Sequence, residues 1–182
     1  MLVVHPDDRS TDFLSVLYTN HPNVVKFNGL DPSMDLGIEL LRAMHDRELT
    51  MFLGHGMPSG LINITHCPGY GNYLINRETA DLYLKDRVNL FGMFCYANKY
   101  AIANHLKGLW SGMIISEVSE AMFMKVKTDQ QEVTEENWNL SRAVRKCLEN
   151  YPLAEIPQAL KTMKRRHSPL CDFNYNSWYY YR

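Results

Sequence analysis

The chain has 182 residues, of which 46% are hydrophobic, enough to bury the core of one domain. Its 19 Lys and Arg residues nearly balance its 20 Asp and Glu residues, and the resulting net charge of −1 argues against nucleic acid or an anionic membrane as a partner. The four cysteines form no C-x-x-C pair, which excludes a zinc ribbon and a dense disulfide framework.

The pattern of apolar runs and the lack of linkers in the sequence indicate its localisation and domain organisation. No basic region or long apolar segment opens the sequence, and no apolar run reaches the length of about 18 residues that crosses a membrane, so we expect a cytoplasmic protein. No linker or repeat divides the chain. We expect a single domain over 1–182, with the core sheet in 1–120 and C-terminal helices and a final strand in 121–182.

Strands are predicted from short apolar runs bounded by turn residues. The expected strands lie at 1–4, 24–27, 50–55, 88–95, 112–116 and 173–181, with a short hairpin at 61–64 and 73–75. Because helical patterns separate most of these runs, the chain predicts a doubly wound, mostly parallel sheet with right-handed crossovers.

Helices are predicted where apolar residues recur at helical spacing. The first would be capped by Thr11 or Asp12, and a later one by Asn76. Further helices are expected over 98–107 and after Pro152, whereas 128–136 is polar and reads as a turn. A helix is expected after that turn, with an apolar stripe formed by Trp138, Leu140, Val144, Cys147 and Leu148. The helix after the second strand is expected to bury Leu36, Leu40, Leu41 and Met44.

Two of the predicted strands lead to reactive side chains. The run from Thr50 ends at His55, and the run from Val88 ends at Cys95. The carboxyl ends of neighbouring strands in an open α/β sheet share one crevice, so the two side chains would meet if their strands are adjacent. An imidazole can lower the pKa of a thiol or take its proton during attack. Gly56 lets the backbone approach a ligand, so its N–H could hold a developing oxyanion.

An apolar run ending in His55-Gly56, followed by an apolar run ending in Cys95, resembles the caspase-type (clan CD) cysteine peptidases, which include caspases, gingipains, legumain and clostripain. The resemblance covers roughly residues 1–120. It implies a three-layer, flavodoxin-like α/β sandwich with helices on both faces, in which the histidine and the cysteine follow the third and fourth strands. Residues 92–94 depart from the caspase pattern, which favours a divergent, bacterial member without aspartate specificity.

The resemblance also implies roles for individual residues. His55 would be the general base and acid, Gly56 an oxyanion donor and Cys95 the nucleophile of an endopeptidase that acts on a peptide or protein and needs no cofactor or metal. A relative that has lost activity would keep the same residues. A catalytically idle interaction module is therefore the second hypothesis.

Substrate preference depends on the loop after the first strand and on the segment after the strand that follows the cysteine, which build the S1 pocket in this family. Carboxylates in a desolvated pocket favour a cationic partner, so we expect cleavage after Arg or Lys. Capping of a helix and solvent exposure are the alternative roles for these side chains. The candidate substrate-binding residues are Asp7, Asp8, Ser116, Glu117 and Glu120.

A rival interpretation rests on the first strand, which ends in His5-Pro6-Asp7-Asp8. This motif resembles the zinc-dependent N-acetylglucosaminyl deacetylase family, in which the histidine and one aspartate bind zinc and the other aspartate is the base. Arg9 stands where that family has glutamate, and no later ligand pair is present. Because a catalytic zinc normally has three protein ligands, we rank this hypothesis lower.

Three further features have ordinary structural explanations. His66-Cys67 lacks a second ligand pair and is expected to be a loop rather than a metal site. The basic 164–166 and aromatic 178–181 segments are expected to be a helix end and a strand rather than a nucleic-acid surface. An exposed edge strand near the C-terminus would allow a homodimer.

Overall fold

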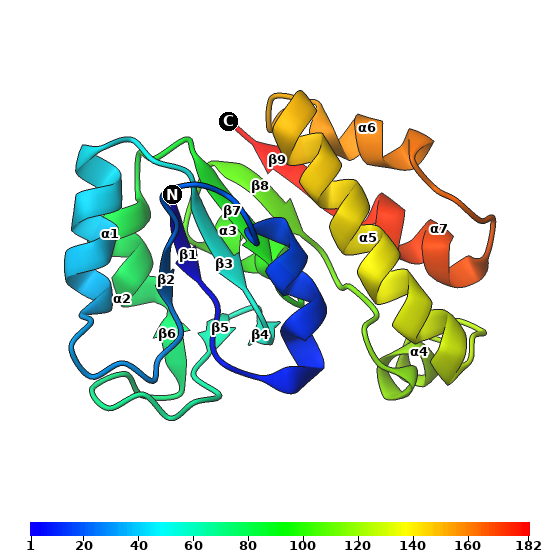
Figure 1. The fold of residues 1–182 in the computed structure, drawn as a ribbon, viewed down its shortest axis with the longest axis horizontal. Helices are drawn as coiled ribbons and strands as arrows, with labels where there is room; N and C mark the ends of the chain where they lie inside the picture. The colour runs from blue at the N-terminus through cyan, green and yellow to red at the C-terminus, as the bar shows by residue number, and fades with distance from the viewer.

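Six strands form the main sheet, in the order β2-β1-β3-β7-β8-β9, in a computed structural model that describes residues 1–182 (Figure 1). Every neighbouring pair is parallel except β8 and β9, which are antiparallel. The chain is therefore an α/β protein with a mixed, mostly parallel sheet. The strands are β1 (Leu2–Val4), β2 (Val25–Phe27), β3 (Thr50–Leu53), β7 (Leu90–Met93), β8 (Gly108–Ser111) and β9 (Trp178–Tyr181).

Helices cover both faces of the sheet, because its central strands are apolar on both sides. Leu2 and Val4 of β1 belong to one buried cluster, and Val3 between them belongs to another. The first cluster packs under α1 (Leu36–His45), the π-helical turn η2 (Ala80–Leu84), which continues α2 (Arg77–Thr79), and α3 (Ala97–Ala103). The second packs under the 3₁₀ helix η1 (Arg9–Leu17), α5 (Gln130–Asn150), α6 (Ile156–Thr162) and α7 (Pro169–Asn176).

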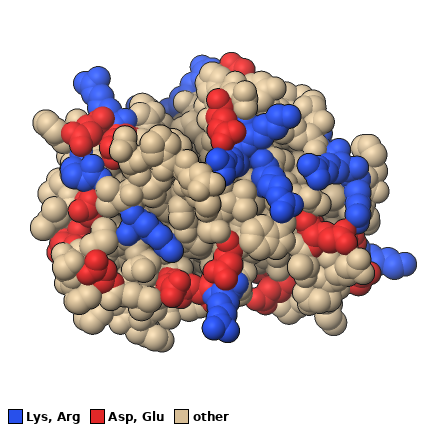
Figure 2. All heavy atoms as spheres, viewed as in Figure 1, with Lys and Arg blue, Asp and Glu red and all other residues tan.

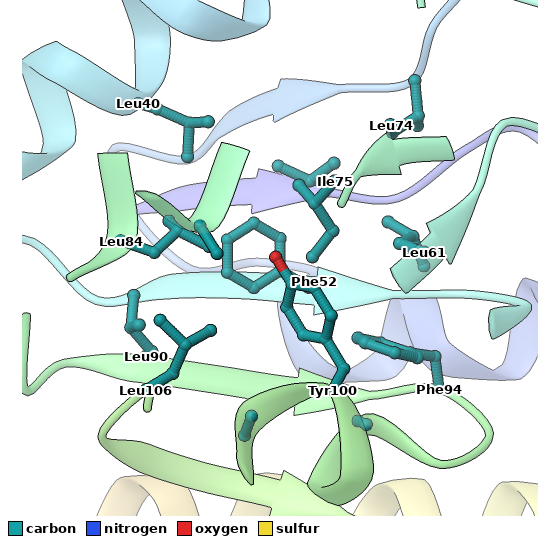
Figure 3. Close-up of a cluster of buried hydrophobic side chains, with 14 of the residues drawn as sticks. Leu40, Phe52, Leu61, Leu74, Ile75, Leu84, Leu90, Phe94, Tyr100 and Leu106 are labelled. Atoms are coloured by element: carbon teal, nitrogen blue, oxygen red, sulfur yellow. The ribbon is translucent and has the colours of Figure 1, made fainter. Parts of the chain in front are cut away.

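Aromatic rings fill the centre of the first cluster (Figure 3). Phe52 of β3 stacks on Trp110 of β8 with ring centroids 6.2 Å apart, and Tyr100 meets the same indole edge-on. Gly92 of β7 leaves the room that the indole occupies, since a Cβ at this position would collide with the Trp110 ring. These contacts fix the spacing of β3, β7 and β8, the strands that lead to the candidate site.

A second, small antiparallel sheet follows β3. It consists of β4 (Gly56–Met57), β5 (Gly60–Ile62) and β6 (Tyr73–Ile75), in that order. The expected hairpin is thus confirmed. The carbonyl of His55 accepts a hydrogen bond from the Ile62 N–H at 2.9 Å, so this sheet holds the backbone on which the imidazole stands.

The fifth strand of the main sheet lies earlier than expected. The sequence predicts a strand at 112–116, but β8 occupies Gly108–Ser111 and the chain beyond it is irregular. Gly108 is not a helix terminator: it begins the strand with a φ of +106°, at a place where a Cβ would strike the Leu90 carbonyl. The close approach of two parallel strands therefore requires glycine here.

The C-terminal third contains more helix than expected. The polar stretch 128–136 is not a turn but opens α5, whose N-cap Asp129 accepts a hydrogen bond from the Glu132 N–H at 2.8 Å. The expected strand over 173–181 is instead the end of α7 followed by β9. α6 begins at Ile156, a turn after Pro152. The apolar stripe over 138–148 lies in α5 as expected, so only the start of this helix differs from the prediction.

The helix caps and faces also need correction near the N-terminus. Asp8, rather than Thr11 or Asp12, caps η1 by accepting the Ser10 N–H. α1 buries Ala43 beside Leu36 and Leu40, whereas Leu41 and Met44 face solvent. No helix of the protein combines the length and the apolar character that a membrane span requires.

The orientation of α1 gives a stability test with neighbouring leucines. Leu40 is fully buried in the first cluster (Figure 3), and Leu41 is 46% exposed. We expect Leu40→Ala to lower the free energy of unfolding by about 2–5 kcal/mol, because it leaves a cavity. Leu41→Ala should change it by no more than about 0.5 kcal/mol, as surface substitutions do. Urea denaturation measures both, and equal losses would contradict this orientation of the helix.

Candidate functional site

His55 and Cys95 lie at the same edge of the main sheet. β3 and β7 are adjacent and parallel, with Leu53 paired to Met93, so both side chains follow immediately beyond the paired strand ends. Both line one small cavity of about 20 Å³. The sequence-based expectation that the imidazole and the thiol share a crevice is therefore met. The other lining residues are Thr11, Phe13, Leu14, Gly54, Met93, Phe94, Ile114 and Ser116.

The backbone around Cys95 forms a sharp turn from strand to helix. Tyr96 has a φ of +62°, a left-handed conformation that is uncommon for a residue other than glycine. Two contacts hold this turn. The Tyr96 N–H donates to the Gly112 carbonyl at 3.1 Å, and the Ser111 hydroxyl donates to the Phe94 carbonyl at 2.9 Å and accepts its N–H at 3.2 Å. A strained turn held on both sides presents the thiol at the sheet edge.

The His55 imidazole is held through one of its two nitrogens. Nε2 lies 3.0 Å from an Asp8 carboxylate oxygen and 2.7 Å from the Ser10 hydroxyl. The Ser10 hydroxyl also donates to Asp8, so the three side chains form a closed group. Nδ1 has no hydrogen-bond partner within the protein. The nitrogen that would exchange a proton with a substrate or a thiol is therefore Nδ1, while Nε2 orients the ring.

Asp8 is ionised in this arrangement. Partial burial would raise the pKa of its carboxyl group, but the side-chain and backbone hydrogen bonds from Ser10, with the nearby His55, outweigh that effect and hold the pKa below its ordinary value. The same residue caps η1. Asp8, a candidate substrate-binding residue, therefore contacts His55 and caps η1, and it lines neither of the two cavities near the dyad residues.

The Cys95 thiol contacts acceptors other than the imidazole. Its Sγ lies 3.6 Å from the Ile114 carbonyl and 3.6 Å from Oε1 of Glu120, and no hydrogen bond joins it to His55. Burial, followed by the charge of Glu120, raises the pKa of the Cys95 thiol to about 12. The thiol is protonated at neutral pH in this conformation. Glu120, expected in a substrate pocket, instead contacts the nucleophile candidate.

A larger pocket of about 460 Å³ adjoins the small cavity and shares Phe13 and Ser116 with it. Two carboxylates, Asp12 and Glu117, line this pocket together with the guanidinium of Arg9. Ser116 and Glu117, two of the candidate substrate-binding residues, both line this pocket. Ser10, Val118, Ser119, Gln130, Thr134, Asn137 and Trp138 complete the lining.

Two other predicted site residues lie outside these cavities. Asp7 is exposed and lines neither of them, and its backbone N–H donates to the Asn28 carbonyl. Gly56 belongs to β4 and does not line the small cavity, although Gly54 does. A Cβ on Gly56 would collide with the Phe94 ring, so glycine is required there for packing.

Sequence reasoning missed Ser10, Asp12 and Ser111. The spacing of Asp8 and Ser10 is an ordinary capping pattern, and nothing in it signals a contact with a histidine 45 positions away. Asp12 was considered only as a helix cap. Ser111 lies in β8, which the sequence placed later in the chain, so its contact with the backbone before Cys95 could not be anticipated.

The residues of the zinc hypothesis do not fit a metal site. His5 is buried, and its Nδ1 and Nε2 lie 3.0 Å from the Tyr18 hydroxyl and 3.2 Å from the Thr11 hydroxyl. Burial lowers the pKa of His5 to about 4, so the ring is neutral and structural. No group of three or more His, Cys, Asp or Glu side chains in the structure could hold a metal ion. His66 and Cys67 are therefore not part of such a group.

The basic and aromatic segments near the C-terminus are largely engaged within the fold. Lys164 pairs with Asp172 at 2.6 Å, and Arg166 pairs with Glu135 at 2.8 Å. Trp178 is buried, and its indole N–H donates to the Asn174 carbonyl. Positive and negative side chains are interspersed over the face drawn in Figure 2, with no large field of one sign.

Comparison with known proteins gives no further guidance: no protein-family model, no curated protein and no solved structure matches this chain significantly.

The Asp8 contacts predict how stability depends on pH. The folded pKa of Asp8 lies below its unfolded value of about 3.9, so its stabilising effect is complete above that pH and disappears as the pH falls through the folded pKa. We expect Asp8→Asn to be less stable than the unmodified protein at pH 7, with the difference shrinking towards pH 2. Urea denaturation at several pH values measures this, and a constant difference would contradict it.

The raised pKa of Cys95 predicts its reactivity. Because the thiolate is the reactive form, the rate of Cys95 alkylation by iodoacetamide should still rise about tenfold per pH unit between about pH 7 and about pH 10. Peptide mapping after timed alkylation separates Cys95 from the other three cysteines. A rate that levels off near the ordinary thiol pKa of about 8.5 would contradict this prediction.

Proposed function

We propose that this protein is a cysteine endopeptidase in which Cys95 is the nucleophile and His55 the general base and acid. The observation that carries the proposal is their shared cavity at the carboxyl ends of β3 and β7, with His55 oriented by Asp8 and Ser10. β3 and β7 are the third and fourth strands of the main sheet along the chain. The caspase-type resemblance implies this placement, and the proposal extends that resemblance to the whole domain over 1–182.

The chemistry follows from the free ring nitrogen of His55. Nδ1 takes the proton of the Cys95 thiol as sulfur attacks the scissile carbonyl, and the imidazolium then gives this proton to the leaving amine. Water hydrolyses the resulting thioester, again with His55 as base, and regenerates the thiol. Asp8 stabilises the imidazolium through Nε2 in both steps. The N–H groups of Gly56 and Cys95 are proposed to hold the oxyanion.

The neighbouring 460 Å³ pocket supports a preference for Arg or Lys before the cleaved bond. Its two carboxylates outnumber its one guanidinium, and Trp138 and Phe13 can cover the aliphatic part of a long cationic side chain. In this proposal Glu117, already a candidate from the sequence, and Asp12 bind the basic side chain in place of Asp7 and Asp8. The substrate is accordingly proposed to be a peptide or protein with a basic residue at this position.

A homodimer is also proposed, through the edge of the sheet. β9 is the outermost strand and pairs only with β8, so its other edge has backbone groups that a second copy could pair with. Tyr179 on this strand is 42% exposed. Neither the dyad nor the basic-residue pocket requires this contact.

One observation favours a second candidate, a catalytically idle domain that binds a partner through the same crevice. The Cys95 thiol has a pKa near 12 and makes no hydrogen bond to His55. A binding module would tolerate both features. The two candidates differ in whether Cys95 can react with a substrate-like electrophile.

Labelling with acyloxymethyl ketone peptides tests the proposal. Probes with Arg, Lys, Asp or Asn next to the ketone are incubated with the protein and with Cys95→Ala and His55→Ala variants. We expect labelling at Cys95 that falls at least tenfold without His55 and is fastest for the Arg and Lys probes. Glu117→Gln should reduce the advantage of these two probes. Folding of each variant is checked by thermal denaturation.

The control variants decide between the two candidates. An absence of labelling at Cys95, both in the folded protein and in a folded Glu120→Gln variant that lacks the carboxylate beside the thiol, would favour the binding module. Labelling of equal rate in the His55→Ala variant would remove His55 from the mechanism. Equal rates for basic and acidic probes would leave the peptidase proposal standing and reject the role of the 460 Å³ pocket.

A further inference from the structure

The segment after β8 places a carboxylate against the candidate nucleophile. Glu120, on α4 (Val118–Phe123), has its Oε1 3.6 Å from the Cys95 Sγ. Its other oxygen accepts three hydrogen bonds: from the Ser116 N–H at 2.7 Å, the Ser116 hydroxyl at 3.0 Å and the Glu117 N–H at 3.1 Å. The carboxylate is therefore fixed by the start of α4, and only Oε1 remains to face the thiol.

The chain that carries Glu120 is itself anchored to the C-terminal helices. Asn174 of α7 accepts the Ile115 N–H at 2.8 Å and donates to the Ile115 carbonyl at 3.0 Å. Asn137 of α5 donates to the Ser116 carbonyl at 2.9 Å. Ile114, whose carbonyl also faces the Cys95 thiol, lies next to these anchors. The contact between Glu120 and Cys95 is thus built into the packing of α4, α5 and α7.

We propose that Glu120 is a latch: its carboxylate keeps the Cys95 thiol protonated and in contact with Glu120 instead of His55. The folded chain is then latent, because its candidate nucleophile is not available for reaction. The inference rests on the proposed function, because a latch matters only where Cys95 is a nucleophile. An anion beside a thiol opposes formation of the thiolate, and the thiol gains an acceptor other than the imidazole. Activation then requires that the Glu120 carboxylate be neutralised or that α4 move, since Ile115 and Ser116 are anchored.

Three charged or titratable groups surround the thiol. Glu120 and Glu117, from the start of α4, both oppose its ionisation, and His55 lines the same small cavity from the other strand end. Glu120 is the one in direct contact. Removing its charge should therefore have the largest effect on the Cys95 thiol.

Glu120→Gln tests the latch with little change to the fold. Glutamine can accept the same backbone hydrogen bonds at the third position of a helix, so α4 keeps its cap. We expect the variant to alkylate Cys95 with iodoacetamide at pH 8 about tenfold faster than the unmodified protein or more, corresponding to a pKa lower by at least about one unit. Cys67 serves as the internal reference, since its rate should not change.

Glu135→Gln is the matched control, because it removes the same charge from an exposed residue that pairs with Arg166 and not with Cys95. It should leave the Cys95 rate unchanged. A second measurement, the pH profile of Cys95 alkylation, should shift to lower pH in Glu120→Gln alone. A rate and a profile identical to those of the unmodified protein, in a variant that melts at a similar temperature, would overturn the latch.

The peptide probes separate this outcome from the proposed function. Faster iodoacetamide alkylation together with faster probe labelling in Glu120→Gln supports both proposals. Faster alkylation without any probe labelling supports the latch and rejects the peptidase. Rapid, His55-dependent probe labelling of the unmodified protein that Glu120→Gln does not increase overturns the latch and leaves the peptidase standing.

Discussion

The parallel pairing of β3 with β7 is the constraint on which the candidate site depends. Thr50 to Leu53 pair in register with Leu90 to Met93, so the two strands end at the same level. A slip of one residue would turn every side chain of a strand to the other face, and the two apolar clusters forbid it because both faces are buried. His55 and Cys95 share a cavity because the core fixes this register.

His55 and Cys95 are each positioned by other residues, but no hydrogen bond joins the two side chains. Asp8 and Ser10 hold the His55 ring through Nε2, while Ser111 and the Gly112 carbonyl hold the turn around Cys95. Such second contacts are what a catalytic group needs for fixed geometry. The thiol, however, faces Glu120. The structure therefore fixes the imidazole and the backbone of Cys95, and the thiol contacts a carboxylate instead of the imidazole.

The C-terminal third of the chain supports the segment that leads to Glu120. α5 and α7 pack against the second cluster and anchor Ile115 and Ser116 through Asn137 and Asn174. The same part of the fold supplies Trp138 to the pocket beside the dyad. Residues 121–182 are therefore part of the site's surroundings as well as its support, which explains why a resemblance confined to the first 120 residues could not describe the cleft.

The sequence by itself determined the alternation of strands and helices, and with it the apolar strands that lead to His55 and Cys95, because buried strands and their turn residues are local patterns. The positions of β8 and of the start of α5 were missed, since Gly108 and the polar residues 128–136 have several local interpretations. Only the tertiary structure decided that Asp8 and Ser10 meet His55 and that Glu120 meets Cys95. Those contacts join residues far apart in sequence, and no local period encodes which carboxylate a given side chain will face.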